Sequence, residues 1–198
     1  MARKEAIKPK FQERTTIIGA GITERWYFSH LQALFNLKIK IRPRFFGNEN
    51  INTLEKLIGQ VLDEGGRAVV VFDADVSMWN ETEKERLVRL RKKYVKNKRV
   101  VLCDSLPSIE YWFLLHYANV NRYFGTSKAV IEELTKYVKD FNKTESFLKN
   151  QKWVFDMCDK GQLDIAFQRA QSFGTEGESY TNIWKAIENI WPIESDKL

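Results

Sequence analysis

Residues 69–76 read Val-Val-Val-Phe-Asp-Ala-Asp-Val, so four apolar residues run directly into two carboxylates spaced one residue apart. A continuous apolar run is typical of a strand covered on both faces, and it predicts the centre of a parallel sheet. Ligands of open α/β sheets bind at the C-terminal ends of such strands. Asp73 and Asp75 would repel each other there unless a cation or a solvated loop relieves them. We therefore expect a divalent metal, the alternative being one helix-capping and one solvated aspartate.

Length and composition narrow the class of protein. The 198 residues suffice for one domain, or one domain with an extension. No apolar run approaches the ~20 residues that span a bilayer, and the basic N-terminus lacks a following apolar region, so we expect a cytoplasmic protein without membrane contact. Two histidines and two cysteines are too few for a metal site built on these residues. Oxygen ligands, and hence magnesium or manganese, are favoured.

The net charge of +6 is concentrated in residues 38–44 and 86–99, which fits a polyanionic partner such as nucleic acid. The alternative is a solvated helix face, because Glu81, Glu83 and Glu85 precede the second cluster and can pair along a helix. The candidate nucleic-acid-binding residues are Arg42, Arg44, Arg89, Lys92, Lys93 and Lys96.

Strand and helix patterns alternate up to about residue 118. Strands are predicted at 15–18, 39–42, 69–72 and 100–103, with 39–42 nearer an edge because its residues alternate. Helices are predicted from about 23, from 52 or 53, over 80–96 and from Pro107 to 116. This order predicts an α/β core at 1–118 with a mostly parallel sheet and a mobile start of about 13 residues. Residues 119–198 form a helical C-terminal portion packed on it, with helices at 127–139, 145–151, 162–172 and 181–190 and a polar break at 142–143.

The turn Gly19-Ala20-Gly21 after the first strand invites a dinucleotide-binding interpretation. The third glycine position of that pattern is Glu24, and no acid follows the second strand to hold a ribose. An arginine there could select a phosphorylated ribose, so this interpretation stays as a minor alternative.

Five segments together resemble the RloB-like proteins, which are Toprim-type domains associated with bacterial restriction and abortive-infection loci. These segments are residues 21–24, 26–28, 72–75, 105–116 and 179–183. The resemblance implies a Toprim-like sheet in which a glutamate after the first strand and the two aspartates after the third bind magnesium. Asp73 and Asp75 match those aspartates, whereas the glutamate position is occupied by Ala20.

Alanine can neither ligate a metal nor transfer a proton, so Ala20 predicts an inactive chain. Either the native protein is a binding-only member, or a native glutamate has been replaced here; we favour replacement because the surrounding motif is intact. Glu24 and Glu110 are the supporting acids. Glu24 could instead cap its helix, and Glu110 could be a solvated first-turn residue. His30 and His116 are expected to be hydrogen-bonded packing residues.

These observations predict a metal-dependent nuclease of the Toprim/RloB-like type. The resemblance implies a role in antiviral defence and an ATPase partner protein. The alternative is a non-catalytic module that binds a nucleic acid or nucleotide signal and acts through a partner. The choice between DNA and RNA, the number of metals and a homodimer through the helical half remain open.

Overall fold

The computed structural model describes residues 14–43, 50–75 and 80–191. Within them, five strands form one sheet in the order β2-β1-β3-β4-β5, in which β1 to β4 are parallel and β5 is antiparallel to β4. The strands are β1 (Thr15–Gly19), β2 (Lys40–Arg42), β3 (Arg67–Asp73), β4 (Val100–Leu106) and β5 (Tyr180–Thr181). The predicted α/β class is confirmed, with the apolar run in the central strand and β2 at an edge.

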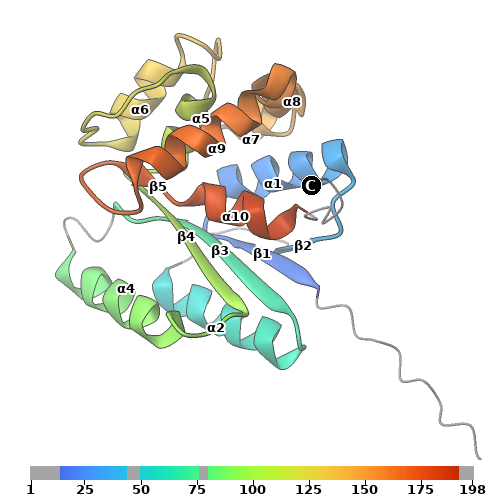
Figure 1. The fold of residues 1–198 in the computed structure, drawn as a ribbon, viewed down its shortest axis with the longest axis vertical. Coiled ribbons are helices and arrows are strands. Elements are labelled where there is room, and N and C mark those ends of the chain that lie inside the picture. Colours follow the sequence, from blue (N-terminus) through green and yellow to red (C-terminus); the bar gives the residue numbers. More distant parts are fainter. Residues whose placement is uncertain (1–13, 44–49, 76–79, 192–198) are drawn as a thin grey trace, which may run out of the picture.

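Helices cover both faces of the sheet (Figure 1). One face carries α2 (Ile51–Asp63) and α4 (Glu81–Tyr94). The other carries α1 (Ile22–Phe35) and α10 (Ile183–Ile190), and the remaining helices stack beyond them. These are α5 (Glu110–Tyr117), α6 (Ser127–Leu134), α7 (Glu145–Leu148), α8 (Lys152–Cys158), a 3₁₀ turn (Asp159–Gly161) and α9 (Gln162–Phe173). Among the described helices, none is long and apolar enough to cross a membrane.

The apolar run of β3 serves two cores. Val69 and Val71 pack into the cluster shared with α1, α5 and α10, whereas Val70 and Phe72 pack into the cluster shared with α2 and α4. Side chains alternate across a strand, so each face takes every second residue. Burying each such side chain contributes about 1.5–3 kcal/mol. This two-sided burial is why the run contains no polar residue until Asp73.

Several boundaries differ from the sequence-based predictions. The helix after β2 is capped by Asn50, which accepts from the N–H of Thr53 at 3.0 Å, and not by Asn52 or Thr53. The helix after β4 begins at Glu110, so Pro107 lies before it and not in its first turn. The helix predicted over 127–139 ends at Leu134, and α8 was not predicted.

The C-terminal part also contributes a strand, where the sequence predicted only helices. Tyr180 and Thr181 form β5 and pair with Leu106 and Ser105 of β4, and α10 begins two residues later than predicted. Two residues give no periodicity to detect, and only the open edge of β4 makes them a strand. The aromatic residues of this part are mainly core, as expected for Trp153; Phe155, however, is 55% exposed.

Candidate functional site

Three carboxylates gather at the C-terminal edge of the parallel strands. Asp73 is the last residue of β3, Glu24 lies in the first turn of α1, and Glu110 is the first residue of α5. Both helices begin at this edge because each follows directly on a strand that ends there. Sequence reasoning identified all three residues, and the structure shows how they meet.

Glu24 is buried, with 4% of its surface exposed. Gly19 and Gly21 make room for it, since a Cβ on Gly21 would lie 2.7 Å from Oε2 of Glu24 and a Cβ on Gly19 would lie 3.2 Å from its Cβ. Burial raises the pKa of Glu24 to about 7; the charge of Glu110 acts in the same direction, whereas backbone hydrogen bonds at Glu24 and Gly21 and the charge of Lys143 act to lower it. The glycine turn thus accommodates a carboxylate at the position where a dinucleotide fold has its third glycine.

Asp73 links β3 to the segment before α5, because its Oδ1 accepts a hydrogen bond from the N–H of Ile109 at 2.8 Å. Burial raises the pKa of Asp73 well above its ordinary value, and the negative charges of Glu24 and Glu110 add to this effect. Asp75 lies two residues further on, partly buried in the turn that follows β3. The ladder itself continues past Asp73, where the N–H of Ala74 donates to the Ser105 carbonyl at 2.8 Å.

Glu110 is fully buried and held from two sides. Ser108 Oγ donates to Oε2 at 2.5 Å, and Lys143 Nζ lies 2.9 Å from Oε1. The alternative of a solvated first-turn glutamate is therefore wrong. Burial of this carboxylate is tolerable because the lysine and the serine hydroxyl replace part of its hydration.

Lys143 is the site residue that sequence reasoning missed. It lies between α6 and α7, in the segment that the sequence marked only as a polar break, and 42% of its side chain is exposed. Burial acts to lower the pKa of Lys143, but Glu110, Asp73 and Glu24 raise it above its ordinary value. A lone lysine in a loop carries no sequence signal, since only the tertiary fold brings it to the acids.

The chemistry of this cluster fits a hard divalent cation. Its donors are carboxylate oxygens, the preferred ligands of Mg²⁺ and Mn²⁺. One lysine faces three acids, and Oε1 of the buried Glu110 accepts no directed hydrogen bond. The geometry is incomplete, however: no three Asp, Glu, His or Cys side chains among residues 14–43, 50–75 and 80–191 converge closely enough to hold an ion.

Ala20 lies at the same edge. It follows β1, and its N–H donates to the carbonyl of Val71 in β3 at 3.0 Å. Gly19 is opposite Val71 in the ladder, so Ala20 lies one position before the level of Asp73. The side chain of Ala20 packs against the cluster on the α2 and α4 face, and it offers no oxygen donor to the edge that holds Asp73 and Glu24.

The described members of the predicted nucleic-acid-binding set do not gather at the carboxylates. Arg42 donates two hydrogen bonds to Glu64 at 2.8 and 2.9 Å, and Lys93 pairs with Glu55. Arg89, Lys92 and Lys96 are exposed on or just after α4. Because α4 connects the parallel strands β3 and β4, it runs away from the carboxylates and its last turn lies far from them. Arg44 lies outside the described residues.

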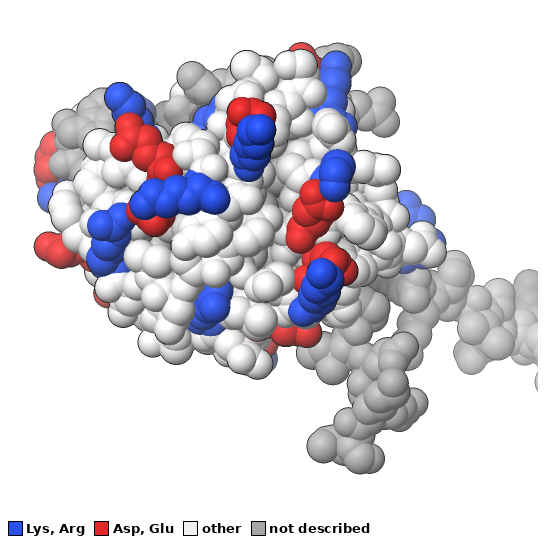
Figure 2. Space-filling model, turned by 90° about the horizontal axis from the view of Figure 1, so that it is seen from above, with Lys and Arg blue, Asp and Glu red and all other residues white. Residues whose placement is uncertain are grey.

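The face formed by the C-terminal helices is mixed in charge. Seen from that side, many basic side chains lie beside acidic ones (Figure 2). The ion pairs of these helices include Lys136 with Glu133, Lys149 with Glu145 and Lys152 with Asp156. Such exposed pairs contribute about 0–1 kcal/mol each.

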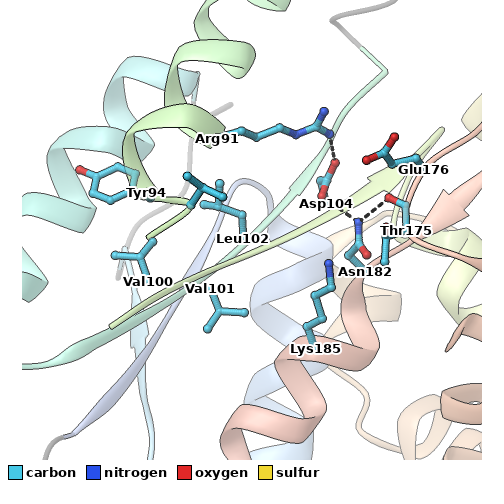
Figure 3. Close-up of a pocket in the computed structure, with 11 residues that line it drawn as sticks. Arg91, Tyr94, Val100, Val101, Leu102, Asp104, Thr175, Glu176, Asn182 and Lys185 are labelled. Carbon is cyan, nitrogen blue, oxygen red and sulfur yellow. Dashed lines mark hydrogen bonds and ion pairs between the residues drawn. The ribbon is translucent and has the colours of Figure 1, made fainter. Parts of the chain in front are cut away.

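A further buried acid, Asp104 of β4, belongs to a separate network (Figure 3). It accepts hydrogen bonds from Arg91, from Tyr180 Oη at 2.7 Å and from Asn182 Nδ2 at 3.0 Å. Arg91, Asp104 and Asn182 line a cavity of about 400 Å³ between α4, β4 and the start of α10. The charge of Asp104 is thus balanced by the ion pair with Arg91. Arg91, which belongs to the basic segment 86–99, therefore has a structural role.

A family model described as "RloB-like protein" matches residues 16–190. The chain belongs to the RloB-like protein family. The match includes every described carboxylate of the site and Lys143. No curated protein and no solved structure matches this RloB-like chain.

The two histidines of the RloB-like chain are packing residues, as expected. The Nδ1 of His116 lies 3.0 Å from the Trp112 carbonyl, and burial lowers the pKa of His116 to about 3. His30 Nε2 lies 2.8 Å from the Leu148 carbonyl, and burial lowers its pKa as well. Both rings are therefore neutral at pH 7 and stand apart from the acids of the site.

Proposed function

We propose that this RloB-like chain is a metal-dependent nuclease of the Toprim type that hydrolyses phosphodiester bonds in nucleic acid. The observation that carries the proposal is the gathering of Glu24, Asp73 and Glu110 around Lys143 at the strand ends. Two buried acids, the half-buried Asp73 and one lysine form a centre with more carboxyl groups than cations, which favours a divalent cation and, through it, a phosphate. By family resemblance, the setting is antiviral defence with an ATPase partner.

Asp73 and Asp75, supported by Glu110, are the residues that would hold Mg²⁺ or Mn²⁺. When bound, such an ion offsets phosphate charge and makes water more acidic. Glu24, whose pKa is raised to about 7, exchanges a proton near neutral pH. Lys143 is partly exposed beside Glu110, and in this proposal it contacts a phosphate oxygen and stabilises the charge that develops there.

The chain carries Ala20, and we propose that the protein is inactive for this reason. A hypothesis follows that the native protein has glutamate at this position. Sequencing of the native gene tests it, and alanine in that gene would show that the family member is naturally degenerate.

The second candidate is a non-catalytic module that binds a nucleic acid or nucleotide signal. Ala20 and the incomplete set of converging ligands favour it. Such a module would hold its ligand through Lys143 and the basic side chains, and it would transmit the signal to a partner protein.

A cleavage assay separates the two functions. We would compare the chain with its Ala20→Glu and Ala20→Gln variants on single-stranded DNA, duplex DNA and structured RNA, with Mg²⁺, with Mn²⁺ or with EDTA. Cleavage by the Ala20→Glu variant alone, only with metal and abolished by Asp73→Asn, supports the nuclease. Failure of every variant to cleave, combined with tight and salt-sensitive binding, supports the module.

A further inference from the structure

A polar groove lies along the open edge of β2. It has a volume of about 700 Å³ and is lined by one face of α1, by the strand and by α2. Arg25, Ser29 and Gln32 lie on α1 at spacings of four and three residues, so they share one side of that helix. Residues 39–43 form the floor, and Leu57 and Gln60 of α2 close the opposite side.

The charge of this groove is positive. Its lining contains Arg25, Lys40 and Arg42 and no acidic residue. Glu64 accepts the two hydrogen bonds of Arg42 and lies 3.9 Å from Lys40. The lining itself carries three cationic side chains, and Ser29, Gln32 and Gln60 add polar groups. This combination suits phosphate groups, which arginine and lysine bind without reading bases.

The groove lies near the carboxylate centre in the fold. Arg25 directly follows the buried Glu24 on α1, and its N–H donates to the Gly21 carbonyl at 3.3 Å. Arg42 is opposite Ile18, which is opposite Val70 of β3, so Arg42 and Asp73 are two strands and three residues apart. The spacings of a parallel sheet place their Cα atoms roughly 14 Å apart. A few nucleotides of a strand span this separation.

We propose that the β2 groove binds backbone phosphates of the nucleic-acid strand that the carboxylate centre receives. The identity of the ligand as a nucleic acid rests on the proposed function. The binding surface itself is additional, because a nuclease centred on the carboxylates does not require this groove. It also shifts nucleic-acid binding away from the last turn of α4, where most of the basic sequence cluster lies, towards the sheet edge beside α1.

The test measures binding of the chain itself, in EDTA, to short fluorescein-labelled RNA and DNA oligonucleotides by fluorescence anisotropy at several salt concentrations. Lys40→Gln removes a groove cation, and Gln60→Glu places a negative charge on the opposite wall. Gln60→Ala is the matched control without charge. Lys128→Gln, on an exposed residue of α6, controls for net charge. Lys92→Gln tests α4 as the rival surface.

We expect several-fold weaker binding for Lys40→Gln and Gln60→Glu, and binding close to that of the parent for the other three variants. The slope of log K against log salt should fall by about 0.7 per lost contact for a single strand and about 0.9 for a duplex. Equal losses for Lys40→Gln and Lys128→Gln, or a loss confined to Lys92→Gln, overturn the inference. If the Ala20→Glu variant cleaves nucleic acid but the groove variants bind it as tightly as the parent does, the groove inference is wrong and the proposed nuclease function stands. If the groove variants bind more weakly but Ala20→Glu does not cleave, the groove inference is supported and the proposed nuclease function is rejected.

Discussion

Lys143 Nζ lies 2.9 Å from Oε1 of Glu110, and this pair joins the loop between α6 and α7 to the first turn of α5. The glutamate is fully buried, whereas 42% of the lysine side chain is exposed. The helical part of the chain thereby reaches into the carboxylate centre of the sheet. This ion pair connects the two halves of the sequence at the site.

The first prediction concerns this lysine. Lys143→Met leaves the buried Glu110 without its cation, and we expect a loss of about 1–3 kcal/mol in the free energy of unfolding, less than for a fully buried pair because the lysine is partly exposed. Urea unfolding at pH 7 measures it. Lys139→Met, on an exposed lysine of the same segment, is the control. Glu110→Gln in the Lys143→Met background should recover much of the loss; no recovery would contradict the pairing.

The second prediction concerns pH. The pKa of Glu24 is raised from an ordinary 4.5 to about 7, so between these values the folded state binds a proton that the unfolded state has released. The contribution of protonated Glu24 to the free energy of unfolding is therefore fully present below pH 4.5, and it is lost as the pH rises towards 7. Glu24→Gln, which mimics the protonated form, should be more stable than the parent at pH 8, by up to about 3 kcal/mol. Urea unfolding between pH 4.5 and 8 checks this; parallel pH curves for parent and variant would rule it out.

The third prediction concerns divalent ions. Mg²⁺ or Mn²⁺ should raise the melting temperature more at pH 8 than at pH 5, because the ion competes with protons for Asp73, whose pKa is raised. Thermal melts at matched ionic strength measure the shift. Asp73→Asn should abolish it, whereas Asp63→Asn, at an exposed residue of α2, should leave it unchanged. A shift of the same size in both variants would place the ion elsewhere.

The fourth prediction separates a structural acid from those of the site. Asp104→Asn removes the charged acceptor of Arg91 and Tyr180, and we expect a loss of about 2–4 kcal/mol in stability. In the Ala20→Glu background, at a temperature where the variant is folded, metal-dependent cleavage should persist. Loss of cleavage in the folded variant, with its secondary structure confirmed by circular dichroism, would move Asp104 into the site.

Local pattern predicted the sheet and its acidic end. The uninterrupted apolar run before Asp73 requires two buried faces, and alternation in 39–42 indicates an edge, so the central place of β3 and the edge place of β2 followed from local chemistry. Glu24 could be singled out from the sequence because it occupies the third glycine position of a dinucleotide-binding pattern, where a charged residue is unexpected. Gly19 and Gly21 then proved to make space for that carboxylate.

The tertiary structure alone decided the partners of these acids. Lys143 reaches Glu110 from a loop, Tyr180 and Thr181 become a strand only against the edge of β4, and the cations of the β2 groove come from two different elements, α1 and β2. Each of these depends on contacts between residues far apart in the chain, and no local periodicity records such contacts. The sequence determined which groups the chain could use, and packing determined which of them meet, because burial and charge act through space.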